Sequence, residues 1–256
     1  MEGVPSGAFG VILAGFAGLL CGSFAGLAGH RLAQGQPIIG AASHCPSCRA
    51  VLGPGDLFPL LSWLVSRGRC RACNAPTGTG YPLVEAVVAV LFIAIYLQRG
   101  AAPGGLLLGA LALGLAVLSV IDLEIGIIPD RILVILAPLG VIYHYGEGAR
   151  ALDGILISVI GGGFAGGVAL AVHYGFKWLR GRDGLGLGDV KFFAVAGLWL
   201  CPFGLPVFMI VSGVSGVAFA LLWRRLGGGR EFPFGPSLCL GLFLCLLFPA
   251  LTRLFG

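Results

Sequence analysis

The chain has 256 residues and a net charge of +5; 57% of its residues are hydrophobic and only 11% are charged. In an ordinary soluble domain roughly a quarter of the residues are charged, so this composition excludes a soluble globular enzyme and a disordered chain. The apolar residues form long uncharged runs at 3–30, 101–121, 154–176, 192–223 and 232–252. Because about 20 apolar residues cross the hydrocarbon core of a bilayer, the sequence predicts an all-α, polytopic membrane protein.

We predict about eight transmembrane spans. In chain order they are 8–32, 81–98, 103–121, 130–146, 154–174, 187–201, 206–223 and 236–254. The uncharged run 192–223 is too long for one span, and Pro202, Gly204 and Pro206 interrupt it. Since proline and glycine end helices, we expect a tight hairpin at 201–206.

The first span has two notable features. No Lys or Arg precedes it and no cleavage site follows it, so we expect a retained span and not a signal peptide. Gly18, Gly22 and Gly26 recur every four residues, which places them on one helix face and favours close packing against another helix.

The distribution of the 16 Lys and Arg residues predicts the orientation of the chain. With both termini outside, only Arg99, Arg150 and Arg253 fall on the outer side, and all others fall on the cytoplasmic side. The long polar loop 33–80 is then cytoplasmic. This bias accounts for the positive net charge, so no nucleic-acid partner is expected.

The eight cysteines form two groups. Cys21, Cys201, Cys239 and Cys245 lie in or beside apolar spans and are expected to be small buried hydrophobes.

The other group comprises Cys45-Pro-Ser-Cys48 and Cys70-Arg-Ala-Cys73, with 21 residues between the pairs. Two such pairs predict one tetrahedral zinc ion whose four thiolates leave no open position for catalysis. A reducing cytosol disfavours disulfides, and no βαβ pattern supports a thioredoxin-like motif. His44 is expected to be a solvated neighbour of this site.

Two aspartates stand out because apolar sequence surrounds them. Asp122 directly follows the run 101–121, and Asp189 lies in Gly186-Leu-Gly188-Asp189-Val-Lys191. The predicted threading places both at the cytoplasmic edge of their spans, where an ionisable group indicates function. The glycines before Asp189 allow close approach of a peptide backbone. Lys191 has three possible partners: Asp189, substrate or lipid.

Other carboxylates have simpler interpretations. We interpret Glu124, Asp183 and Glu231 as solvated loop charges, and Asp130, after Pro129, as a structural cap.

The chain resembles the type IV prepilin peptidases, which are polytopic aspartic proteases of the G-x-G-D kind. The resemblance runs over nearly the whole length, on Gly22-Ser-Phe24, His30-Arg-Leu32, His44-Cys-Pro-Ser-Cys48, Pro59-Leu-Leu-Ser-Trp63, Arg67-Gly-Arg-Cys-Arg-Ala-Cys73, Tyr81-Pro-Leu-Val-Glu85, Asp122 to Asp130, Gly186-Leu-Gly-Asp-Val-Lys191 and Phe232-Pro-Phe-Gly-Pro236. The chain departs from the family at Ala25-Gly26-Leu27, where Leu-Asn-Val is usual.

The resemblance implies that Asp122 and Asp189 are the catalytic pair. It implies cleavage of the basic leader of type IV prepilins or type II secretion pseudopilins, at the cytoplasmic face of the bacterial inner membrane. It also implies N-methylation of the new N-terminus with S-adenosylmethionine. No glycine-rich motif follows a strand, so the residues that bind this cofactor are unknown. Glu85 is one candidate for this role. The alternative is that Glu85 is a carboxylate at the membrane edge that pairs with an arginine.

The expected domain organisation is a first span at 1–32, a zinc-binding loop at 33–80 and a peptidase core in the membrane at 81–256. The expected partners are prepilin or pseudopilin substrates and membrane lipid.

Three alternatives remain. The first is a peptidase without methyltransferase activity. The second is a transporter, which should show repeat symmetry and a polar pathway, and the third is a zinc-binding membrane adaptor, which would not need the two aspartates. A metalloprotease is disfavoured because no H-E-x-x-H element is present.

Overall fold

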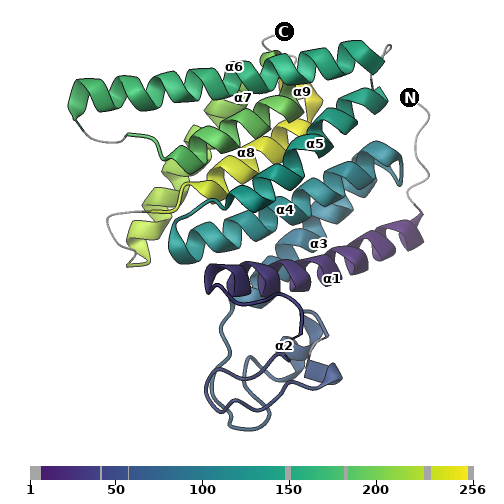
Figure 1. Ribbon diagram of the computed structural model, residues 1–256. Coiled ribbons are helices and arrows are strands. Elements are labelled where there is room, and N and C mark those ends of the chain that lie inside the picture. The colour runs from purple at the N-terminus through teal and green to yellow at the C-terminus, as the bar shows by residue number, and fades with distance from the viewer. Residues whose placement is uncertain are drawn as a thin grey trace. The chain divides into compact units, whose positions relative to one another are not determined.

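The computed structural model describes residues 7–40, 42–56, 58–147, 151–181, 184–227 and 232–252. These residues form helices, and their β-structure is limited to two isolated bridges, His44–Val51 and Arg69–Pro76. The predicted all-α fold is confirmed. The chain divides into two compact units, residues 1–100 and 101–256 (Figure 1).

The first unit consists of two long helices and the loop between them. Its elements are α1 (Ala8–Ala33), a 3-10 turn (Pro54–Asp56), α2 (Leu61–Val65) and α3 (Gly80–Arg99).

The predicted glycine face of α1 packs directly on the backbone of α3. A Cβ on Gly18 would lie 2.6 Å from the Cα of Ala89, and one on Gly22 would lie 2.7 Å from the Cα of Glu85. Both distances are shorter than any side chain tolerates, so glycine is required at both positions. The order of these contacts makes α1 and α3 antiparallel, and the predicted role of the glycines is confirmed.

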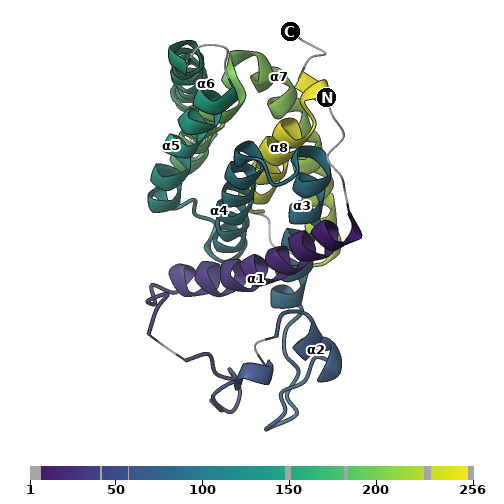
Figure 2. The ribbon, with the colours of Figure 1, turned by 90° about the vertical axis from the view of Figure 1, so that its right-hand side faces the viewer.

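The second unit contains the remaining helices. They are α4 (Pro103–Ile125), α5 (Asp130–Glu147), α6 (Ala151–Arg180), α7 (Leu187–Arg225), α8 (Gly235–Leu247) and α9 (Pro249–Thr252). Within this unit α6 packs along α7, and α4 lies beside α8 (Figures 1 and 2).

Helix α7 reverses direction at a kink. Cys201 has φ 56° and ψ 175°, outside the helical region, and prolines follow at 202 and 206. A straight helix of 39 residues would be about 58 Å long. Yet Leu187 and Trp223, near the two ends of α7, line one cavity. The hairpin predicted at 201–206 is therefore confirmed.

Hydrogen bonds hold the first half of α7 near the kink. Trp199, fully buried, donates its Nε1–H to the carbonyl oxygen of Leu136 at 3.0 Å, and Nε2 of His144 lies 2.8 Å from the carbonyl oxygen of Trp199. On the other face of α7, Gly197 meets Gly161 of α6 at backbone contact. The first half of α7 is thus fixed between α5 and α6.

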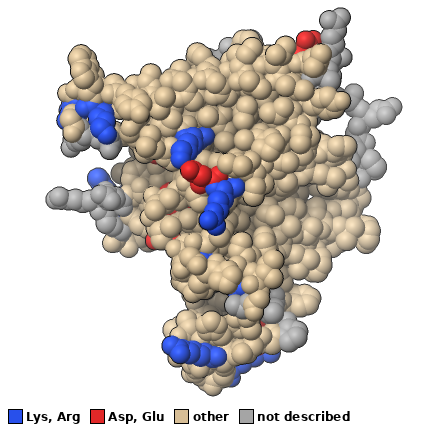
Figure 3. All heavy atoms as spheres, in the orientation of Figure 1, with Lys and Arg blue, Asp and Glu red and all other residues tan. Residues whose placement is uncertain are grey.

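Five of the described helices, α1, α3, α4, α6 and α7, are long and apolar enough to cross a membrane. Helix α8, with 13 residues, is shorter, and α5 is not among the five. The eight-span prediction is therefore confirmed only as far as a multi-pass helical protein. The face seen in Figure 3 is accordingly almost uncharged, with its charges gathered in a few small groups.

Candidate active site and metal centre

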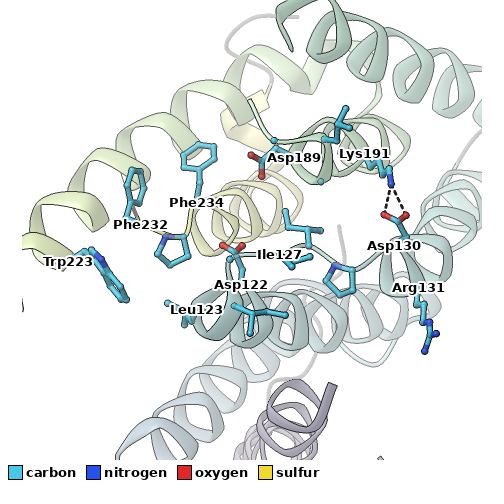
Figure 4. Close-up of a pocket in the computed structure, with 18 residues that line it drawn as sticks. Asp122, Leu123, Ile127, Asp130, Arg131, Asp189, Lys191, Trp223, Phe232 and Phe234 are labelled. Atoms are coloured by element: carbon cyan, nitrogen blue, oxygen red, sulfur yellow. Dashed lines mark hydrogen bonds and ion pairs between the residues drawn. The ribbon is translucent and has the colours of Figure 1, made fainter. Parts of the chain in front are cut away.

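The second unit contains a cavity of about 970 Å³ lined by both predicted aspartates. Its walls come from the end of α4, the 126–129 segment, the start of α5, both ends of α7 and the segment before α8. Figure 4 shows the Asp122 and Asp189 carboxylates facing each other across it. Residues 67 positions apart in sequence are thus brought to one site.

Asp122 lies in the last turn of α4 and is buried, with 6% of its surface exposed. Gly126 ends this helix in the left-handed conformation, φ 66°, where glycine carries no steric penalty. The Asp122 Oδ2 atom accepts a hydrogen bond of 2.7 Å from the backbone N–H of Gly235, the first residue of α8. A carboxylate is favoured there because the free N–H groups of a helix start carry partial positive charge.

Asp189 lies in the first turn of α7 and is half-buried. The loop before it is anchored by His173 of α6, whose Nδ1 lies 2.6 Å from the carbonyl oxygen of Leu185. A Cβ on Gly188 would lie 3.2 Å from the Cβ of Ile128, which follows Asp122 in the chain. The glycine therefore lets the start of α7 approach the segment that leaves α4.

An ion pair joins two of the segments that line the cavity. Lys191 Nζ lies 2.8 Å from Oδ1 and 2.7 Å from Oδ2 of Asp130, the first residue of α5. Both side chains are more than half exposed. Lys191 therefore has Asp130 as its partner, which was not among the partners considered from the sequence.

Three aromatic residues form another side of the cavity, and we call them the aromatic wall: Trp223, Phe232 and Phe234. Trp223 comes from the end of α7, and the two phenylalanines directly precede α8. The Phe232–Pro236 motif had no predicted role. Of the carboxylates interpreted as solvated, Glu124 is exposed on α4, and Asp183 and Glu231 lie outside the described residues.

Two carboxylates across one cavity are sufficient for hydrolysis of a peptide bond without a covalent intermediate. The ionised carboxylate accepts a proton from water, and the protonated one donates to the carbonyl oxygen. The volume fits a short stretch of extended peptide.

The four cysteines predicted as metal ligands form a cluster in the first unit. All four Sγ atoms lie within 4.8 Å of one another, with 3.9 Å between Cys45 and Cys73 and 4.0 Å between Cys48 and Cys70. A tetrahedral zinc site with bonds of about 2.3 Å has sulfur atoms about 3.8 Å apart. The described cluster therefore has the geometry of a site that could hold a metal ion. His44 lies outside it and is exposed.

Two identical turns present these cysteines. The N–H of Cys45 donates to Ala50 and the N–H of Arg49 donates to Cys45, both at 2.9 Å, and the second turn repeats both bonds 25 residues later. Arg49 and Asn74, at equivalent places, both have positive φ. Backbone N–H groups of Cys48 and Ser47 point at the Cys45 sulfur, and the backbone N–H of Ala75 points at the Cys73 sulfur.

Two of these thiols have pKa values shifted in opposite directions. Backbone N–H groups of Cys48 and Ser47 donate to Cys45 and lower the pKa of its thiol to about 6. At Cys73 the backbone N–H of Ala75 lowers the pKa, but hydrogen bonding with Cys48 and burial outweigh it and raise the pKa to about 11. Cysteines bind metal ions as thiolates, and four sulfurs at these distances are a donor set that fits one zinc ion.

Glu85 lies in α3, within the first unit. It is buried, and its Oε2 accepts a 2.7 Å hydrogen bond from the backbone N–H of Leu60, a residue with φ 58°. This hydrogen bond fixes the cysteine loop to α3. The sequence had suggested an arginine as the partner of Glu85, whereas the partner seen here is a backbone amide.

Comparison with known proteins gives consistent matches over both units. Residues 16–99 match the Bacterial Peptidase A24 N-terminal domain, and residues 109–221 match the Type IV leader peptidase family. A "Prepilin leader peptidase/N-methyltransferase" of Aeromonas hydrophila is 35% identical over 217 residues, covering 82% of this chain and 73% of the relative. One of Burkholderia pseudomallei (strain K96243) is 31% identical, covering 96% of this chain and 87% of the relative.

A third relative, the "Type 4 prepilin-like proteins leader peptide-processing enzyme" of Escherichia coli O78:H11, is 33% identical, covering 78% of this chain and 72% of the relative. No solved structure matches the chain.

The five apolar helices and the matches to leader peptidases place the chain in the class of helical membrane proteases. The chain belongs to the type IV leader peptidase family.

Proposed function

We propose that this protein cleaves the basic leader peptide from type IV prepilins or type II secretion pseudopilins, and that Asp122 and Asp189 carry out the hydrolysis. One observation carries the proposal: the two aspartates, far apart in sequence and embedded in apolar helices, line one cavity. A zinc-binding adaptor gives no reason for this pairing, and a transporter, which would also hold carboxylates in the membrane, should show a repeat symmetry that the sequence lacks. The names of the relatives supply the substrate class.

In the proposed reaction a water molecule attacks the carbonyl carbon of the scissile bond. One aspartate takes the water proton, the other protonates the carbonyl oxygen, and collapse of the tetrahedral intermediate returns a proton to the leaving amine. Asp122, held by the Gly235 N–H, and Asp189, at the start of α7, are available for both roles.

The proposed threading has eight spans with both termini outside, in the bacterial inner membrane. It divides the chain into the first span at 1–32, the cysteine loop at 33–80 and the peptidase core at 81–256. The site then opens to the cytoplasm, where a basic leader stays while the apolar pilin helix lies in the membrane. The cut falls between the leader and the apolar helix. We expect a small residue just before the cut, because Gly186 and Gly188 let the substrate backbone come close to Asp189.

The four clustered cysteines are proposed to bind one zinc ion with a structural role. Cys45, Cys48, Cys70 and Cys73 would fill its coordination shell, so zinc would cross-link a loop that has no core of its own.

N-methylation of the new N-terminus with S-adenosylmethionine is proposed from the names of the relatives alone. No described residue is assigned to that cofactor, and a peptidase without methyltransferase activity is the second candidate.

The experiment is cleavage of a prepilin-type substrate by the purified protein in detergent or lipid, with mass spectrometry of both products. The expected cut lies between the basic leader and the apolar helix, and added S-adenosylmethionine should increase the product mass by one methyl group. A cut inside the apolar helix would contradict the placement of the site. An unmethylated product would leave a peptidase only.

A further inference from the structure

The short helix α2, in the cysteine loop, leaves one apolar side unburied. Phe58, Leu61, Leu64 and Val65 each expose more than half of their surface, and we call these four residues the α2 patch. The N–H of Ser62 donates to the carbonyl oxygen of Phe58, so a helical turn already begins at Phe58. Because residues three apart are neighbours on a helix, Phe58, Leu61 and Leu64 share one face.

Another side of α2 is fixed to the second cysteine turn. A Cβ on Gly68 would lie 3.0 Å from the ring of Trp63, and the Gly68 N–H donates to the carbonyl oxygen of Trp63 at 2.9 Å. The carbonyl oxygen of Gly68 in turn accepts a 2.8 Å hydrogen bond from the N–H of Thr77. The α2 patch is thus held on a rigid support, and a contact made by the patch would position the cysteine cluster.

The depth of α2 along the membrane helices follows from the hydrogen bond of Leu60 to Glu85. Leu60 directly precedes α2, and Glu85 is the sixth residue of α3, about 8 Å along the helix from its start. The backbone of Glu85 also meets α1 at Gly22. Both α1 and α3 are long and apolar enough to cross a membrane. Helix α2 is therefore held beside two membrane helices, near the ends that the loop joins, which is the level of the lipid headgroups.

The segment after α2 is basic. Residues 33–80 contain four arginines and one acidic residue, Asp56, which pairs with Arg71 at 2.9 Å. Arg67 and Arg69 are exposed and have no carboxylate partner among the described residues. An exposed apolar helix face followed by unpaired cations is typical of a segment that lies on anionic lipid. A second copy of this basic loop would be repelled.

We propose that the α2 patch is a membrane-surface anchor whose apolar side chains enter the boundary between headgroups and acyl chains, while Arg67 and Arg69 bind the phosphates of anionic phospholipids. The anchor holds the cysteine loop on the same bilayer that α1 and α3 cross. It gives the exposed apolar side chains a cover that the described loop itself does not provide.

The first experiment places a photoreactive benzophenone amino acid at position 65 of the full chain in nanodiscs of phosphatidylglycerol and phosphatidylcholine. Mass spectrometry should find lipid attached to this position. The matched control is position 51, because Val51 is also an exposed valine of the loop but lies in the bridge to His44. Position 65 should give several-fold more lipid adduct than position 51. Equal yields would overturn the anchor, and so would cross-links from position 65 to residues 101–256 or to a second copy.

The second experiment tests the charge contribution by chymotrypsin digestion in nanodiscs, since the enzyme cuts after Trp63 and Leu64 only where the anchor leaves the bilayer. Each arginine at an anionic surface strengthens attachment by about fivefold. Arg67→Gln should therefore speed this cut by about fivefold in phosphatidylglycerol and leave it unchanged in phosphatidylcholine. Arg49→Gln, on the first cysteine turn, is the matched control and should leave the rate unchanged in both lipids.

An equal acceleration by Arg67→Gln in both lipids, or no acceleration in phosphatidylglycerol, would contradict the contact with anionic lipid. Neither experiment uses a leader peptide or its cleavage. The anchor is therefore decided separately from the proposed function.

Discussion

Asp122 owes its position to Gly235, a residue 113 positions further along the chain. The Gly235 N–H donates to the Asp122 carboxylate, and a Cβ on Gly235 would lie 2.7 Å from Oδ2 of Asp122 and 2.8 Å from its Cγ. The Phe-Pro-Phe-Gly-Pro motif thus has a definite physical purpose: it brings a helix start, with its free N–H groups, against a buried carboxylate. No sequence pattern indicates which carboxylate such a helix start will meet.

Gly235→Ala should lower kcat/KM for leader cleavage by about 10- to 100-fold, because the added methyl group displaces a reacting carboxylate. Gly163→Ala is the matched control, since a Cβ at Gly163 meets no atom within 4 Å. Thermal unfolding of both variants is measured alongside the rate. Equal activity of the two variants would show that Gly235 does not set the position of Asp122.

At the scale of elements, the cysteine loop shows how a segment without an apolar core becomes ordered. Two equivalent turns, 25 residues apart, present four sulfurs at distances suited to one ion. The loop is joined to α3 through the hydrogen bond of Leu60 to Glu85. The spacing of the cysteine pairs predicted the cluster, because a Cys-x-x-Cys turn is local. The Glu85 bond was not predictable, because it joins residues whose proximity arises only in the folded chain.

Replacing Cys45 and Cys48 together by Ser should reduce the bound zinc from about one per chain to near zero, since two thiolates do not retain the ion. The measurement is metal analysis of freshly purified, reduced protein, with limited proteolysis to detect loosening of residues 33–80. Cys21→Ala, in α1, should keep its zinc. Leader cleavage should fall less than in the aspartate variants; an equal loss would give the metal a part in the reaction.

Hydropathy and charge predicted much of the fold at the scale of the whole molecule. The uncharged runs located the helices, and Pro202, Gly204 and Pro206 located the reversal that returns the end of α7 to the cavity. Both signals are local and composition-based. The pairing of Lys191 with Asp130 was missed, because which charged groups meet at the ends of helices depends on packing that hydropathy does not encode.

The predicted threading places the loop at Gly100 outside the cytoplasm and the loop at Leu226 inside it. Alkaline phosphatase, which is active only outside the cytoplasm, should be active when fused after Gly100 and inactive when fused after Leu226. The reason is that most Lys and Arg residues lie in loops on the same side of the membrane as Leu226, and positively charged loops stay in the cytoplasm. The reverse pattern would place the aspartate cavity on the outer face and exclude a cytoplasmic leader as substrate.

Cleavage by single aspartate variants tests the central claim most directly. Asp122→Asn and Asp189→Asn, each purified as folded protein, should cleave a prepilin-type substrate at least about 100-fold more slowly than the unchanged protein, because asparagine keeps the shape but cannot transfer the proton. Glu124→Gln, two residues from Asp122 but exposed, should cleave at nearly the normal rate. Near-normal cleavage by either aspartate variant would contradict the account.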